Sequence, residues 1–90
     1  MIYELAYTKK AFSDLQDLSI TDSRRIVAKL KYIVVQPDPL KYSKPLKGVY
    51  KGLLRFRIGD YRAIFSKDAK GTLTLLTIIR VQHRKDVYEK

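Results

Sequence analysis

Three stretches typical of β-strands follow one another closely in the second half of the chain. Residues 52–58, 61–67 and 72–81 are rich in β-branched and aromatic side chains, and turn-forming residues at 59–60 and 68–71 separate them. Turns at this spacing favour an antiparallel meander, in which each strand pairs with the next. The remainder of the 90-residue chain must therefore pack against this sheet.

A strand, two helices and a loop are expected before the meander. Residues 2–7 are strand-like, and Thr8 can cap a helix that runs to about Leu18. A second helix must end before Pro37, because the residue preceding a proline disfavours helical conformation. Residues 37–47 contain all three prolines and are expected to form a loop. The apolar positions at helical spacing are Ala11, Phe12, Leu15 and Leu18 in the first helix and Ile26, Val27, Leu30, Ile33 and Val34 in the second.

These elements predict a single α+β domain spanning residues 1–90. An N-terminal strand, an αα-hairpin and the meander would form a four-stranded sheet with both helices on one face. Side chains alternate between the faces of a strand, so Leu54, Phe56 and Ile58 should face the helices. Arg55 and Arg57 would then lie on the opposite, open face.

The charge of the chain indicates a polyanionic partner. The net charge is +10, and residues 44–90 contribute twelve basic and four acidic side chains to it. The absence of cysteine excludes disulfides, thiol nucleophiles and cysteine-ligated zinc. One histidine and scattered carboxylates predict no metal site and no cofactor. Neither a signal peptide nor a membrane-spanning stretch is predicted, which favours the cytoplasm.

Basic and proton-transferring side chains are expected to gather on the open face and its edge. Arg55 and Arg57 point the same way, Arg62 begins the next strand, and a segment starting at His83 follows the last strand. RNA cleavage without metal needs a base for the 2′-hydroxyl, cations for the phosphate and an acid for the leaving 5′ oxygen. Histidine can transfer protons near neutrality, and arginine binds phosphate with two parallel hydrogen bonds. This set of residues therefore indicates RNA as the polyanion.

Three motifs give the chain a resemblance to the RelE/ParE superfamily of toxins from type II toxin–antitoxin pairs. They are Pro-Leu-Lys-Gly at 45–48, Arg-Phe-Arg-Ile-Gly-Asp-Tyr-Arg at 55–62 and His-Arg-Lys-Asp-Val-Tyr at 83–88. Together with the order of strands and helices, the resemblance covers nearly the whole chain. It implies a toxin that is bound by a small acidic antitoxin in a hetero-oligomer.

The RelE branch of this superfamily cleaves mRNA in the ribosomal decoding site. The resemblance implies catalytic roles for Arg55, Arg57, Arg62 and Tyr88, and some members also use a histidine that matches His83. The best-known member has Lys-x-Lys where this chain has Arg55 and Arg57. Arginine essentially cannot release a proton, which favours His83 as the general base. The expected RNA contacts are Lys47, Lys51, Arg80, Arg84 and Lys85, whereas Gln82 occupies a place where some members have an arginine.

Two other functions fit the same fold. The ParE branch poisons DNA gyrase and is not a nuclease, and a third possibility is an inactive basic binding module. Individual residues also have structural interpretations, in which His83 is a structural histidine, Tyr88 fastens the tail to the core, and Arg55 and Arg57 form a solvated strand face.

Overall fold

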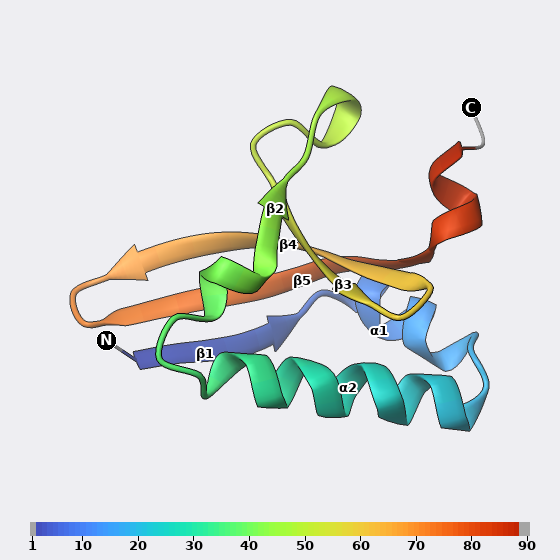
Figure 1. Cartoon of the computed structure of the whole chain (residues 1–90), viewed down its shortest axis with the longest axis horizontal. Helices are drawn as coiled ribbons and strands as arrows, with labels where there is room; N and C mark the ends of the chain where they lie inside the picture. The colour runs from blue at the N-terminus through green and yellow to red at the C-terminus, as the bar shows by residue number, and fades with distance from the viewer. Residues whose placement is uncertain (1, 89–90) are drawn as a thin grey trace.

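The computed structural model describes residues 2–88, with the side chains of 87 and 88 excepted. Two helices lie along one face of a twisted sheet (Figure 1). The elements are β1 (Ile2–Tyr7), α1 (Lys9–Gln16), α2 (Ile20–Val34), β2 (Ser43–Pro45), β3 (Leu54–Ile58), β4 (Tyr61–Lys70) and β5 (Leu73–His83), with 3-10 helices η1 (Pro39–Tyr42), η2 (Gly48–Tyr50) and η3 (Arg84–Tyr88).

The sheet is mixed and has five strands in the order β1-β5-β4-β3-β2. The predicted meander is confirmed, since β3, β4 and β5 pair antiparallel, and β1 adds to β5 in parallel. The expected count of four strands is wrong by one. β2 lies within the stretch expected to be a loop, and it pairs with the outer edge of β3. A proline is tolerated there because an edge strand does not need every backbone donor.

The hairpin between β4 and β5 is tighter than predicted. β4 continues to Lys70, so residues 68–70 pair with β5 instead of forming the turn. Gly71 has a φ of 61°, in the left-handed region that a two-residue hairpin turn requires and that glycine adopts without strain.

Both helices begin at side-chain caps. Thr8 Oγ1 accepts a hydrogen bond from Ala11 N at 3.1 Å, as predicted, and Ser19 Oγ accepts one from Asp22 N at 3.1 Å. α1 has only eight residues and buries a narrow face, and Phe12, one of the apolar positions at helical spacing, is 58% exposed. The buried core contains Ala11, Leu15, Ile26, Leu30 and Ile33 from the helices and Phe56, Ile58, Ala63, Phe65, Leu76, Ile78 and Val81 from the sheet.

Helix α1 also covers the edge of β5 beyond the end of β1. Thr8 N donates to the carbonyl oxygen of Ile78 and Thr8 Oγ1 to that of Ile79, each at 3.0 Å. Further along, Val81 N donates to Asp14 Oδ2 at 2.9 Å. The register of β4 with β5 shifts in this region, between Ile64 and Phe65. Beyond the last residue of β1, the free edge of β5 from Ile78 to Val81 is thus held by Thr8, the N-cap of α1, and by the side chain of Asp14.

Candidate functional site

Arginines form a row across the open face of the sheet, the face not covered by helices. Arg57 on β3 is paired with Arg62 on β4, and Arg62 is paired in turn with Gln82 on β5. Arg55 lies two residues before Arg57 and therefore on the same face. Phe56 and Ile58, between and beyond these arginines, are buried on the helix side as predicted. Arg55, Arg57 and Arg62 are called the arginine row below.

The arginine row concentrates positive charge in a partly desolvated place. Burial lowers the pKa of Arg55, and the nearby charges of Arg57 and Arg62 lower it further. Arg55 shares its face with Ile64, its register partner, whose side chain is fully buried. Like charges held together in this way favour the binding of an anion, because an anion relieves their mutual repulsion.

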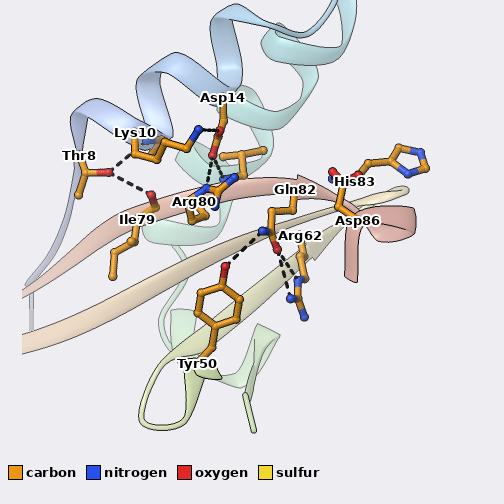
Figure 2. A network of polar contacts seen from close by, with 12 residues as sticks. Thr8, Lys10, Asp14, Tyr50, Arg62, Ile79, Arg80, Gln82, His83 and Asp86 are labelled. Atoms are coloured by element: carbon orange, nitrogen blue, oxygen red, sulfur yellow. Dashed lines mark hydrogen bonds and ion pairs between the residues drawn. The ribbon is translucent and has the colours of Figure 1, made fainter. Parts of the chain in front are cut away.

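Gln82 connects the arginine row to a tyrosine that the sequence analysis did not select. Its Oε1 accepts hydrogen bonds from Nε and Nη2 of Arg62, at 3.4 and 3.2 Å. Its Nε2 donates to the hydroxyl of Tyr50, at 3.3 Å, and the Arg62 guanidinium carbon lies 5.7 Å from the centre of the Tyr50 ring. Figure 2 shows Gln82 between Tyr50 and Arg62. The only sequence signal for Tyr50 is an aromatic residue between two lysines, after Gly48.

Arg80, which was expected to contact RNA, has an internal carboxylate partner. Its Nε lies 2.9 Å from Asp14 Oδ2, and Figure 2 shows it directed toward α1 and away from Arg62. The hydrogen bond with Asp14 raises the pKa of Arg80 against the effect of burial, and the hydroxyl of Tyr50 raises it further. Asp14 is a second residue that the sequence analysis missed. Its carboxylate is only 8% exposed and also lies 3.4 Å from Lys10 Nζ.

His83 lies outside the single patch that was expected. It is the register partner of Tyr61, whose hydroxyl donates to Asp22 Oδ2 of α2 at 3.1 Å, so this pair faces the helix side. The two rings meet edge to face, with centroids 5.1 Å apart. The cause is the alternation of the strand, which turns His83 away from the face that carries Gln82. Figure 2 shows its ring directed away from Arg62.

The backbone and the ring of His83 make hydrogen bonds that cap the start of η3. Its Nδ1 accepts from Lys85 N at 3.1 Å, and its backbone N donates to Asp86 Oδ2 at 3.2 Å. This reciprocal pattern is similar to a capping box, except that the side chain of His83 accepts from the second residue of η3 and not from the third. His83 therefore has a structural role whatever its part in chemistry.

The remaining predicted residues lie around the end of the sheet and on either side of η2. Arg84 and Lys85 are exposed, and Arg84 Nε lies 3.7 Å from Asp60 Oδ1. Lys47 and Lys51 are exposed on either side of η2. The side chain of Tyr88 lies outside the described residues. Lys47 and Lys51 are thus close in sequence to Tyr50, which contacts the arginine row.

Metal and membrane features are reported for the described residues only. Between residues 2 and 88, no three His, Asp or Glu side chains are grouped as metal ligands would be. Neither helix within that range has the length and apolar character needed to cross a membrane.

Comparison with known proteins gives consistent matches over almost the full length. Residues 5–88 match the family described as ParE toxin of type II toxin-antitoxin system, parDE. Toxin RelG of Mycobacterium tuberculosis (strain ATCC 25618 / H37Rv) is 30% identical over 92 residues, covering all of both chains.

Two solved complexes contain chains similar in sequence and fold. One is the toxin–antitoxin complex RelBE2 from Mycobacterium tuberculosis, with 29% identity, coverage of 93% of this chain and 100% of that chain, and a TM-score of 0.65. The other is the archaeal RelE–RelB complex from Pyrococcus horikoshii OT3, with 28% identity, coverage of 93% and 97%, and a TM-score of 0.65. The chain is a toxin of a type II toxin–antitoxin system and belongs to the ParE toxin family of the RelE/ParE superfamily.

Proposed function

We propose that this toxin is a metal-independent endoribonuclease that cleaves mRNA on the ribosome, in the cytoplasm. The observation that supports the proposal most is the arginine row, three cations on the face opposite α1 and α2, with the pKa of Arg55 lowered by burial and by its two neighbours. A row of this kind suits the phosphates of an extended RNA strand. Arg84, Lys85, Lys47 and Lys51 supply further contacts to the backbone in this proposal.

The chemistry is a transfer of the phosphate from the 5′ oxygen to the neighbouring 2′ oxygen. A base removes the proton of the 2′-hydroxyl, the 2′ oxygen bonds to phosphorus, and the bond from phosphorus to the 5′ oxygen breaks as that oxygen receives a proton. Arg55, Arg57 and Arg62 stabilise the negative charge that develops on the phosphate oxygens. This reaction needs neither a redox step nor an external cofactor.

For the two proton transfers we propose His83 and Tyr88. The ring of His83 lies on the other side of β5 from Gln82, so its participation requires the RNA to bend around the end of the sheet. His83→Asn separates the two roles of this residue. Asparagine offers an oxygen to Lys85 N but cannot act as a base near neutrality. If His83 is the base, His83→Asn loses at least about 10²-fold in cleavage with an unchanged melting temperature.

The proposed test of the arginine row compares two alanine substitutions on β4, one of an arginine within the row and one of a lysine outside it. Arg62→Ala should lower the rate of mRNA cleavage on purified ribosomes by about 10²–10³-fold, as for loss of one charge-stabilising donor. Lys67→Ala removes the same charge from an exposed position of β4 outside the row and should cleave at nearly the wild-type rate. Equal activity of Arg62→Ala and Lys67→Ala would remove Arg62 from the site.

We propose a small acidic antitoxin as the partner that restrains the toxin. The net charge of +10 supports an acidic partner, and RelB accompanies RelE in the similar archaeal complex. A segment that is disordered when free and folds on binding would bury much of this basic surface. Co-purification from a two-gene operon, with elution measured against salt concentration, tests both the partner and its charge.

The alternative is a gyrase inhibitor without nuclease activity, which the ParE description of the matched family favours. The two functions leave different damage in arrested cells. A nuclease cleaves mRNA within codons and leaves chromosomal DNA intact, whereas a gyrase poison breaks the chromosome and leaves mRNA intact. Tyr88→Phe removes one hydroxyl, so it should weaken a nuclease and leave a surface inhibitor almost unaffected. We expect mRNA fragments and a weakened Tyr88→Phe toxin.

A further inference from the structure

We infer that Gln82 is a positioning residue, which orients the guanidinium of Arg62 toward an RNA phosphate without neutralising its charge. The inference rests on the proposed function in that RNA is taken as the ligand. It assigns to Gln82, together with Tyr50, a specific part in substrate binding on the open face.

The hydrogen bonds of Arg62 leave one edge of its guanidinium available. Gln82 Oε1 takes the Nε and Nη2 side, at 3.4 and 3.2 Å. An arginine has five N–H donors, and those on Nη1 together with the second one on Nη2 point away from this side. They form a two-pronged end, the geometry that binds a phosphate with parallel hydrogen bonds. Arg62 is partly exposed, so this end can be reached by a ligand.

Tyr50 fixes the orientation of the Gln82 amide. The Gln82 Nε2 donates to the Tyr50 hydroxyl at 3.3 Å, which turns the amide oxygen toward Arg62. The reversed amide would place donors against a guanidinium that has no acceptor, and is therefore disfavoured. The Tyr50 ring also lies beside the Arg62 guanidinium, at 5.7 Å from its carbon to the ring centre. Residues from η2 and β5 thus hold Arg62 together.

The neutrality of Gln82 distinguishes Arg62 from two neighbouring arginines. Arg80 lies 2.9 Å from Asp14 and Arg84 lies 3.7 Å from Asp60, so each has a carboxylate partner. A carboxylate orients an arginine but competes with a phosphate for it. An amide accepts the same hydrogen bonds and leaves the positive charge for a ligand. The partner of Arg62 is therefore suited to binding, whereas the partner of Arg80 is suited to structure.

A double-mutant cycle tests the inference on binding alone. The probe is a short single-stranded RNA with 2′-O-methyl sugars, which cannot be cleaved by 2′-hydroxyl attack, and affinity is measured by fluorescence anisotropy at several salt concentrations. Gln82→Leu should weaken binding about 3–10-fold, as expected when one hydrogen-bonding partner of a charged group is lost. In the Arg62→Ala background the same change should have no further effect. Gln16→Leu, at an exposed position of α1, is the control.

Two further variants separate orientation from charge. Gln82→Glu keeps an acceptor for Arg62 but neutralises it, so binding should weaken and its salt dependence should decrease by about one phosphate contact. Tyr50→Phe keeps the ring and removes the hydroxyl, and should weaken binding about 2–3-fold. If Gln82→Leu fails to fold, Tyr50→Phe tests the orientation of Arg62 in its place.

The inference is overturned if Gln82→Leu binds as tightly as wild type, or if it weakens binding equally with and without Arg62. Cleavage of unmodified mRNA by the wild-type toxin is measured in parallel. An intact binding cycle without any cleavage would refute the nuclease proposal and support the role of Gln82. Cleavage of mRNA without coupling between Gln82 and Arg62 would support the nuclease proposal and refute the role of Gln82.

Discussion

Removal of the Asp14 carboxylate should destabilise the toxin more than any other single loss of charge on α1. Asp14 Oδ2 accepts from Arg80 Nε and Val81 N, each at 2.9 Å, and its side chain is 8% exposed. In Asp14→Ala, loss of the acceptor for the buried Val81 N–H costs about 1–3 kcal/mol. The Arg80 side chain is 30% exposed and can hydrogen-bond to water in the variant. Loss of its ion pair with Asp14 therefore adds only about 1 kcal/mol to the destabilisation.

The expected total is therefore about 2–4 kcal/mol, against a stability of about 5–13 kcal/mol for a chain of this length. This corresponds to a decrease in melting temperature of about 10–25 °C. Urea unfolding followed by circular dichroism measures the change, with Asp17→Asn, at an exposed position at the end of the same helix, as the control for charge.

The pH dependence provides a second test of the same contact. Burial raises the pKa of Asp14, but the hydrogen bonds from Arg80 and Val81 and the charge of Arg80 outweigh it and hold the pKa below its ordinary value of 3.8. A carboxyl group with a depressed pKa stabilises the folded state above its unfolded pKa, and this stabilisation is lost as the pH falls through the folded value. Asp14→Asn should therefore lose less stability than wild type when the pH falls below about 4. An Asp14→Ala protein as stable as Asp17→Asn, or an Asp14→Asn protein with the wild-type pH profile, would refute this account of the α1–β5 contact.

Other predictions concern the core and the chemistry. Tyr7→Phe should raise the free energy of unfolding by about 1 kcal/mol, because within the described residues the Tyr7 hydroxyl is buried without a hydrogen-bond partner; an unchanged or lower value in urea would show that water or another group satisfies it. Cleavage of mRNA should persist in excess chelator once the magnesium needed by the ribosome is maintained separately, and activity that returns only with added zinc or manganese would contradict the proposed mechanism. Phe12→Ser should leave the melting temperature within a few degrees of wild type, since Phe12 is 58% exposed, and a large decrease would place it in a buried contact.

The parts of the fold that follow a simple period could be predicted from the sequence. The alternation of side chains along β3 correctly predicts that Phe56 faces the core and Arg57 the opposite side. The turn between β3 and β4 sets the pairing of Arg57 with Arg62. β2 could not be predicted, because three residues ending in a proline carry no periodic signal. Such a short strand forms only because β3 offers an unpaired edge.

The site was less predictable than the fold, because its partners depend on local departures from regular structure. The register shift near Ile64 changes the phase of β5, so Ile78 and Val81 are both buried and Arg80 comes onto the face of Ile64 and Gln82. Counting alternate residues predicts neither this change of face nor the hydrogen bond from Arg80 to Asp14 of α1. Tyr50 meets Gln82 across 32 residues of sequence, and neither motif nor spacing indicates such a contact. His83 was grouped with the arginines by proximity, whereas its position on the strand puts it on the other face.

The parallel pairing of β1 with β5 has a consequence for the synthesis of the toxin. β1 is made before the other described strands, yet its strand partner among the described residues, Leu73 to Ile78 of β5, is made after all of them. A growing chain therefore carries an unpaired β1 until most of β5 has emerged, and the sheet closes late because its most distant segments must meet. The arginine row depends on the same β5 through Gln82. Incomplete chains released before β5 should consequently lack both the closed sheet and the assembled site, so that toxicity begins only once β5 has been made.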